Sequence, residues 1–298
     1  MRILIVGLVK NPQFLRVKEE GEARGHSVIG CYASDLIIEV SEGDFSVRLK
    51  KGDLNYDLIY LWAVGKRRWD WYAACLHLSK TQGTIVVNKK VIDPSYNYYL
   101  TSSIDYLKQV EEGLPFPKTS VIFSEKAVDN IINEYKYPVI LKTSEGRQGR
   151  GVFKVEDESE LREKVKRILK KSPSVIIREY IPNDGDIRVF TVGYKAIGAM
   201  KRTPTTEGEF RSNISVGGKG EKYELESYPD IRDLAEKASL ITKTEIAGVD
   251  IMINKDSGKP FILEVNPGPQ FTGLEKYTGV NAALEIIKYF EMLYNNRK

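Results

Sequence analysis

The fold is decided by AGVDIMI at residues 247–253 and by FILEVN at residues 261–266. Each stretch has the apolar character of a buried strand, yet each carries a carboxylate, Asp250 in the first and Glu264 in the second. Side chains on a strand point alternately to opposite faces. Glu264 and Asn266 are therefore expected on one face of their strand, while the apolar residues between and beside them take the other.

The connection between these strands, Asn254–Pro260, is rich in turn-forming residues and predicts a hairpin. A turn centred near Ser257 places Asp250 opposite Glu264, so three oxygen-bearing side chains converge with Asn266. Hard oxygen ligands of this kind suit Mg²⁺. The alternative is a structural role, in which Asp250 and Glu264 form buried ion pairs with nearby Lys or Arg, because a buried carboxylate is costly without a cation.

The first part of the sequence predicts a small α/β unit with a parallel sheet. Continuous apolar runs, typical of strands buried on both faces, recur at residues 2–7, 58–62 and 84–87. A helix-like segment at residues 71–79 lies between the last two. The turn after the first strand, GLVKNPQ, lacks the second and third glycines of a dinucleotide-binding fingerprint, which excludes NAD at this place.

Composition excludes several classes of protein. The chain has 298 residues, enough for about two domains, and a net charge of only +4, too weak to indicate nucleic acid as the main partner. Its cysteines, Cys31 and Cys75, and its histidines, His26 and His77, lack the spacing of a disulfide framework, a zinc site or a His-dependent triad. No apolar stretch approaches the ~18–20 residues that span a bilayer, and we expect a cytoplasmic protein.

A glycine-rich loop follows the strand that contains Lys142. The segment PVILK at residues 138–142 is followed by TSEGRQGRG, and a further strand is expected at residues 152–155. The loop joins two strands and is not a Walker P-loop. The loop contains three glycines, Gly146, Gly149 and Gly151, which allow backbone N–H groups to approach an anion. Lys142 adds a positive charge for phosphate. An exposed hairpin with incidental basic residues is the alternative.

Two further segments have the composition of a nucleotide site. The strand VIIREYI, residues 175–181, leads into a polar turn, and such a hinge can hold a purine against Tyr180 and Ile181 while Asp186 faces a ribose hydroxyl. The segment GEFRSN, residues 208–213, packs charge and hydrogen-bond donors together, as an anionic transition state requires. Taken alone, the first segment fits a plain strand and turn, and the second fits a solvated loop.

In this order, the segments resemble the ATP-grasp superfamily, specifically the RimK-type amino-acid ligases. The resemblance covers residues 115–295 well and the first 92 residues loosely. It implies an α/β (α+β) fold in which an N-terminal parallel-sheet domain precedes a two-lobed ATP-grasp fold. The expected parts are the N-terminal domain at 1–92, a connecting helix and linker at 93–117, a small lobe at 118–180, and a C-terminal lobe with the metal site at 181–298.

The resemblance also assigns roles to individual residues. It implies that Lys142 contacts ATP phosphates and that the hinge Glu179–Ile181, with Tyr180 at its centre, holds adenine. It implies that Asp186 binds the ribose. Arg211, Ser212 and Asn213 would face the phosphates or the reaction centre. Arg211 and Lys142 would be the catalytic cations. Asp250, Glu264 and Asn266 would bind Mg²⁺ or Mn²⁺.

The activity implied is an ATP-dependent carboxylate–amine ligation through an acyl phosphate. The resemblance suggests that an amino acid such as glutamate is added to a peptide, a protein tail or a small-molecule carboxylate, and that the enzyme is a homo-oligomer. Basic residues near the expected site indicate acidic substrates, unless their charges serve ATP itself: Arg147, Arg150, Lys201 and Arg202. Trp62, Trp69 and Trp71, beside the basic run at 66–68, either line an acceptor cleft or belong to an amphipathic core helix.

The sequence departs from the family pattern in two places. The usual Asp-Lys pair is replaced near Thr101 and Ser102. We expect either a substitute cation from elsewhere, such as Lys89 or Lys90, or a low affinity for the nucleotide. The metal motif continues as PGPQF, stiffer than the usual small-residue sequel, so a different acceptor pocket is expected. Two alternatives therefore stay open, an ATP-grasp phosphotransferase and a nucleotide-binding module without catalysis.

Overall fold

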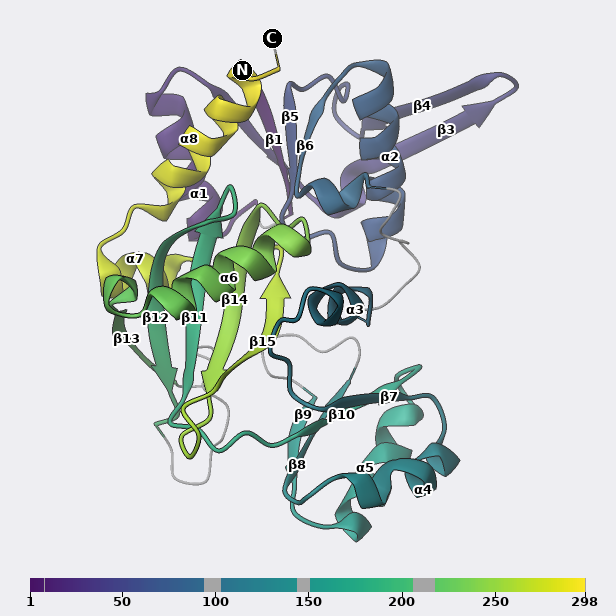
Figure 1. The fold of residues 1–298 in the computed structure, drawn as a ribbon. Coiled ribbons are helices and arrows are strands. Elements are labelled where there is room, and N and C mark those ends of the chain that lie inside the picture. Colours follow the sequence, from purple (N-terminus) through teal and green to yellow (C-terminus); the bar gives the residue numbers. More distant parts are fainter. Residues whose placement is uncertain (8, 94–102, 144–150, 206–217, 298) are drawn as a thin grey trace.

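The structure is a computed structural model that describes residues 1–7, 9–93, 103–143, 151–205 and 218–297. Its described strands form a four-stranded parallel sheet, a four-stranded antiparallel sheet, a five-stranded antiparallel sheet and a two-stranded hairpin (Figure 1). This mixed α/β architecture is the fold class expected from the sequence. The parallel sheet and the five-stranded sheet lie next to each other, and the four-stranded antiparallel sheet lies beyond the second of them (Figure 1).

The parallel sheet has the strand order β2-β1-β5-β6. Its strands and flanking helices are β1 (Arg2–Val6), α1 (Pro12–Ala23), β2 (Ser27–Cys31), β5 (Leu58–Leu61), α2 (Arg68–Thr81) and β6 (Ile85–Val87). The central strands are buried on both faces, which is why they read as continuous apolar runs. All three predicted strands are confirmed. The helix predicted at 71–79 is confirmed and is longer than expected.

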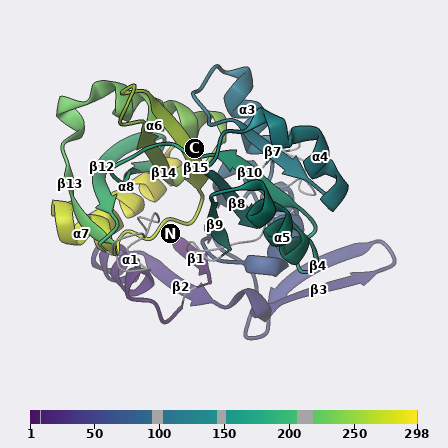
Figure 2. The ribbon, with the colours of Figure 1, turned by 90° about the horizontal axis from the view of Figure 1, so that it is seen from below.

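A hairpin that the sequence reading missed extends away from the parallel sheet (Figures 1 and 2). It consists of β3 (Leu36–Ser41) and β4 (Asp44–Leu49). The pairing register places apolar residues opposite one another at Leu36 and Leu49, Ile38 and Val47, and Val40 and Phe45. One face of the hairpin is therefore apolar, and at its base Leu49 joins the core under α2.

The small antiparallel sheet has the order β7-β10-β8-β9. Its elements are β7 (Thr119–Ile122), α4 (Val128–Ile131), β8 (Val139–Thr143), β9 (Val152–Val155), α5 (Glu158–Leu169) and β10 (Val175–Glu179). Asp157 and Glu160 have the D-x-x-E spacing that predicts a helix start, and α5 is capped there, since Asp157 Oδ1 accepts from Glu160 N at 2.8 Å.

The apolar spacing of residues 124–135 predicts one helix, and this prediction is wrong. Two 3₁₀ segments, Glu125–Ala127 and Ile132–Glu134, flank the four-residue helix α4. The segment has β-branched residues and Asp129-Asn130 at its centre, which have low helix propensity. Its apolar side chains nevertheless pack on the sheet, with Val128 and Ile132 buried.

The five-stranded sheet carries the two stretches that opened the sequence reading. Its order is β13-β12-β11-β14-β15. Its elements are β11 (Asp186–Val192), β12 (Lys195–Thr203), β13 (Lys219–Tyr223), α6 (Pro229–Ile241), β14 (Ile246–Ile253), β15 (Pro260–Asn266) and α7 (Thr272–Thr278). Helix α6 covers one face of this sheet (Figure 1).

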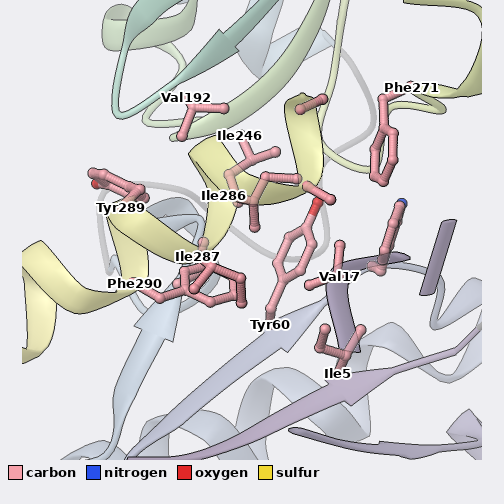
Figure 3. Close-up of a cluster of buried hydrophobic side chains, with 14 of the residues drawn as sticks. Ile5, Val17, Tyr60, Val192, Ile246, Phe271, Ile286, Ile287, Tyr289 and Phe290 are labelled. Atoms are coloured by element: carbon pink, nitrogen blue, oxygen red, sulfur yellow. The ribbon is translucent and has the colours of Figure 1, made fainter. Parts of the chain in front are cut away.

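The last described helix, α8 (Ala282–Asn295), returns to the first part of the chain and packs beside α1 (Figure 1). Ile286, Ile287 and Phe290 lie in one buried cluster with Ile5, Tyr60 and further residues of the parallel sheet (Figure 3). The same cluster contains Val192 and Ile246 of the five-stranded sheet. A shared core therefore holds the two sheets together.

The remaining described elements are the connecting helix α3 (Ser103–Glu111) and short 3₁₀ turns at Ala33–Asp35, Gly65–Arg67, Lys89–Val91 and Leu225–Ser227. Cys31 and Cys75 are buried free thiols, as the absence of a disulfide framework predicted. None of the helices in the described ranges has the length and apolar character to cross a membrane.

Candidate active site

The hairpin of β14 and β15 brings the three predicted metal ligands together. Asp250 pairs directly with Glu264, and Gly248 pairs with Asn266. Asn266 Nδ2 donates to Glu264 Oε1 at 2.9 Å and lies 3.5 Å from Asp250 Oδ2. The predicted register is confirmed. It is reached through a β-bulge, because Ile253 pairs with Pro260 next to the turn and the register shifts between Asp250 and Ile251.

The two carboxylates of this cluster have different surroundings. Asp250 is buried, whereas Glu264 is exposed and has no ion-pair partner within the described ranges. The cluster consists of two carboxylates and one amide. Among the described residues there is no group of three His, Cys, Asp or Glu side chains that could hold a metal ion. Within the part of the chain that the structure describes, the side-chain hydrogen bonds of Asn266 all involve Nδ2, which leaves the lone pairs of Oδ1 for a ligand. This set of oxygen donors fits a hard divalent cation such as Mg²⁺.

Asp250 is held by two arginines from neighbouring strands. Arg188 on β11 and Arg202 on β12 both contact its carboxylate, the second at 3.1 Å. Burial pushes the pKa of Asp250 upward, but the charges of Arg188 and Arg202 outweigh it and hold the pKa well below its usual range. The ion pairing considered as the alternative thus holds for Asp250, and the carboxylate is fixed in its charged form.

Asp186 requires a correction, because it belongs to β11 and not to a polar turn. It is buried, and both of its oxygens accept from Arg202, Oδ1 from Nε at 2.8 Å and Oδ2 from Nη2. The preceding Gly185 has φ +108, and a Cβ there would lie 2.2 Å from the Arg202 carbonyl oxygen. Only glycine permits so close an approach, which explains the Gly-Asp sequence.

Arg202 is accordingly not a free cation for an acidic substrate. Its side chain is buried between Asp186 and Asp250, because two carboxylates in the interior require a shared positive charge. Of the basic residues that suggested acidic substrates, Arg147 and Arg150 lie outside the described residues. Lys201, on the same strand as Arg202, is half-buried.

Lys142 lies on β8, paired in register with Ile176 of β10. Burial, followed by the charge of Arg178, lowers the pKa of Lys142 to about 8. The negative charges of Glu264, Asp250 and Asp186 act in the opposite direction. These effects place Lys142 in the electrostatic field of the metal-ligand cluster, although the two come from different sheets.

The predicted hinge lies at the end of β10. Glu179 Oε1 accepts from Lys118 N at 2.7 Å, and Lys154 Nζ lies 4.9 Å from the centre of the Tyr180 ring. Ile181 is buried. The chain continues from this hinge directly into β11, so the hinge connects the small sheet to the five-stranded sheet.

Arg178, immediately before the hinge, is a residue whose part the sequence reading missed. Its Nε donates to Thr119 Oγ1 in the small sheet, and its Nη1 donates to the Leu263 carbonyl in the five-stranded sheet, both at 3.0 Å. Its guanidinium lies 4.6 Å from the centre of the Phe116 ring. The side chain thus links the two sheets next to Glu264. Its position in VIIREYI, an Arg within an apolar run, was the available signal.

Several predicted residues receive no structural account. Gly146, Gly149, Arg211, Ser212, Asn213, Thr101 and Ser102 lie outside the described residues. Gly151, at the edge of its loop, has φ +78, where glycine is favoured. Both lysines considered as substitute cations have acidic neighbours, since Lys90 pairs with Asp105 and Lys89 Nζ lies 3.8 Å from Glu245.

The three tryptophans do not form one cleft. Trp71 is fully buried in the core of the parallel sheet and donates to the Ala33 carbonyl at 2.9 Å. Trp62 is buried in a different cluster, stacked on Phe271 with ring centres 5.8 Å apart. Only Trp69 is partly exposed, under the Arg68 guanidinium. For Trp71 the core-helix alternative is correct.

Comparison with known proteins shows what this chain is similar to. The family described as "RimK-like ATP-grasp domain" matches residues 101–290. A protein of Vibrio atlanticus named "Probable alpha-L-glutamate ligase" is 31% identical over 300 residues, covering 98% of this chain and 95% of its own. A protein of the same name from a Marinomonas species is 31% identical over 302 residues, with the same coverage.

Solved structures share the fold. The ATP-grasp ligase PsnB, complexed with a phosphomimetic variant of its minimal precursor, Mg and ADP, superimposes with a TM-score of 0.74 at 19% identity, covering 98% of each chain. D-cycloserine synthetase DcsG has a TM-score of 0.72 at 14% identity, covering 99% of this chain and 100% of its own. At these identities the likeness concerns the fold alone.

Proposed function

The chain belongs to the RimK-like ATP-grasp family and is an ATP-dependent ligase, and on this premise we propose that it adds glutamate, through its amine, to the carboxylate of a peptide, a protein tail or a small molecule. The observation that carries the proposal is the convergence of Asp250, Glu264 and Asn266 on the β14–β15 hairpin. Glutamate is suggested by the names of the relatives.

The reaction has two steps, and neither requires a nucleophile from the protein. An acceptor carboxylate oxygen attacks the γ-phosphorus of ATP, the bond to the β-phosphate oxygen breaks, and an acyl phosphate and ADP form. The amine then attacks the acyl carbon, phosphate leaves, and the nitrogen loses a proton to give the amide. The work left to the protein is positioning and charge neutralisation.

Lys142 supplies a positive charge to the phosphates from β8, and Arg211 is the second catalytic cation of the proposal. Adenine is held at the hinge Glu179–Ile181, with Tyr180 and Ile181 against the base. Asp186 is engaged with Arg202, but each of its oxygens keeps a second lone pair that a ribose hydroxyl can use. Ser212 and Asn213 complete the set of phosphate contacts.

Asp250, Glu264 and Asn266 are the residues that hold the divalent cation, Mg²⁺ or Mn²⁺. When bound, such an ion neutralises phosphate charge and aligns the phosphate oxygens for transfer. Arg188 and Arg202 keep Asp250 charged before the ion arrives. Glu264, exposed and unpaired among the described residues, supplies the negative charge that the two arginines do not offset.

The test is ADP release with ATP, Mg²⁺, pooled amino acids and pooled carboxylate acceptors, with the products read by mass spectrometry. If the protein is a ligase, the mass of the product equals the sum of the masses of two substrates minus water, and this mass identifies the amino acid and the acceptor. A stable phosphorylated product with no need of an amine indicates the phosphotransferase instead. Tight ATP binding without turnover in any mixture indicates a binding module. Light scattering checks the predicted homo-oligomer.

A further inference from the structure

Asn88 joins the parallel sheet to the open end of the β14–β15 hairpin. It follows β6 directly, is 2% exposed and has φ +54. Its Oδ1 accepts from Ile246 N at 2.9 Å, and its Nδ2 donates to the Pro267 carbonyl at 2.8 Å. Both polar atoms of the side chain are therefore used, and both partners belong to the hairpin.

The two contacts lie next to the proposed metal ligands. Ile246 is the first residue of β14, which carries Asp250, and Pro267 follows Asn266 at the end of β15. Pairing between the strands ends at Gly248 and Asn266. The turn holds the strands together at the other end, so Asn88 connects them just beyond the last pair, where the hairpin has no turn of its own.

Pro267 makes the side-chain contact more important. Proline has no N–H, so its carbonyl is the only backbone group through which this residue can be held. That carbonyl also accepts from Tyr60 Oη at a longer 3.3 Å. The position of the chain directly after Asn266 is thus fixed from the parallel sheet, by Asn88 and Tyr60 together.

Asn88 is itself held in place. The next residue, Lys89, donates its backbone N–H to the buried Glu245 carboxylate at 2.9 Å, and Tyr289 Oη of α8 donates to the other oxygen at 2.7 Å. Asparagine tolerates a positive φ better than most residues and carries an acceptor and a donor on one planar group. Aspartate has no donor for Pro267, and glycine has neither group.

We propose that Asn88 is a positioning residue for the divalent-cation site. It fixes the position of Asn266 through the Pro267 carbonyl and that of Asp250 through the start of β14. This inference rests on the proposed function, because it takes Asp250, Glu264 and Asn266 as the metal ligands. Partners one step removed from a metal hold its ligands in the binding geometry, and changing such a partner typically lowers metal affinity by about 10- to 100-fold.

The experiment compares Asn88→Asp with Thr84→Val. Asn88→Asp keeps the shape and the acceptor for Ile246 but turns an oxygen toward the Pro267 carbonyl. Thr84→Val removes a buried hydrogen bond, from Oγ1 to the Tyr56 carbonyl at 3.1 Å, just before β6, without touching the hairpin. Mn²⁺ binding to the enzyme–ADP complex is titrated by electron paramagnetic resonance, and thermal unfolding is recorded for each variant.

We expect Asn88→Asp to weaken Mn²⁺ binding by about tenfold or more, and Thr84→Val to lower the unfolding temperature while leaving Mn²⁺ affinity unchanged. Equal losses of affinity in both variants, or a folded Asn88→Asp protein with normal affinity, overturn the positioning role. Tyr60→Phe removes only the second hydrogen bond to Pro267 and serves if Asn88→Asp does not fold. Its affinity is expected to fall less, and an unchanged affinity overturns the role.

Asp250→Asn and Glu264→Gln separate the two levels of the argument. If both weaken Mn²⁺ binding while Asn88→Asp does not, the metal assignment stands and only the positioning role falls. If neither weakens it, the metal assignment falls and the positioning role falls with it.

Discussion

Arg188 and Asp250 face each other across β11 and β14 and share two hydrogen bonds, from Nε to Oδ1 at 2.7 Å and from Nη2 to Oδ2 at 2.6 Å. Such two-point contact fixes the orientation of a carboxylate as well as its charge. Asp250 is therefore positioned before any cation binds. The arrangement spares the site the entropy of ordering this ligand.

Asp250→Asn should lower the rate of ADP release by about 10²-fold or more, because it removes a charge from a preorganised site. The matched control is Asp129→Asn, which also breaks an Asp–Arg contact, but at the exposed pair with Arg162. Rates are measured at saturating ATP and Mg²⁺. Near-normal turnover of Asp250→Asn would remove Asp250 from the metal site.

The pH dependence of kcat/KM for ATP should report Lys142. Its pKa is lowered to about 8, so the side chain is a cation below that pH and becomes neutral above it. The value of kcat/KM is therefore expected to fall as the pH rises through about 8. In Lys142→Arg, which stays charged, this limb should disappear.

Arg178→Met offers a second check on the same limb. The Arg178 charge lowers the pKa of Lys142, so its removal should shift the fall in kcat/KM to higher pH. The control is Arg167→Met, which removes an arginine of α5, the helix packed on the small antiparallel sheet, whose guanidinium lies over the Phe153 ring. An identical profile for wild type and Arg178→Met would contradict the coupling.

Arg202→Met should destabilise the fold strongly. Asp186 and Asp250 share this guanidinium in the interior, and removing one partner of a buried ion pair costs about 3–5 kcal/mol. Urea unfolding measures the loss. Arg162→Met, at an exposed pair with Asp129, is expected to change the free energy of unfolding by less than about 1 kcal/mol. Equal stabilities of the two variants would refute the buried role.

Phe290→Ala should lower the free energy of unfolding by about 3–5 kcal/mol, because it empties a fully buried position. Met292, on the same helix, is 46% exposed, and Met292→Ala should have a small effect. Phe290 lies between α8 and the parallel sheet (Figure 3). Chemical denaturation of both variants provides the comparison, and a small effect of Phe290→Ala would show that this helix contributes little.

The metal-ligand hairpin was predictable because its information is local. Alternation puts Glu264 and Asn266 on one face, and the turn at Asn254–Pro260 brings the strands together. The pairing of Asp250 with Glu264 also depends on a β-bulge between Asp250 and Ile251, which the sequence analysis did not predict. The hairpin of β3 and β4 had similar local signals, alternating apolar residues around Glu42-Gly43, and was missed although they were present.

The partners of the site were not predictable in the same way. Arg202 contacts Asp186 and Asp250 only because β12, β11 and β14 lie in that order in the sheet, which no spacing reveals. Asn88 bonds to residues 158 and 179 positions away in sequence. A single asparagine after a short strand gives no indication of contacts that depend on how two sheets pack.

The position of α8 has a consequence for how the protein is made. The strands of the parallel sheet precede α8 in the chain, yet Ile286, Ile287 and Phe290 of that helix cover part of the sheet. Until α8 has been synthesised, the part of the sheet that Phe14 and Val17 of α1 do not cover stays exposed, and exposed apolar surface is prone to aggregation. The core around the parallel sheet is therefore complete only when α8 is in place, and a truncation that removes α8 affects the packing of β1 and β5.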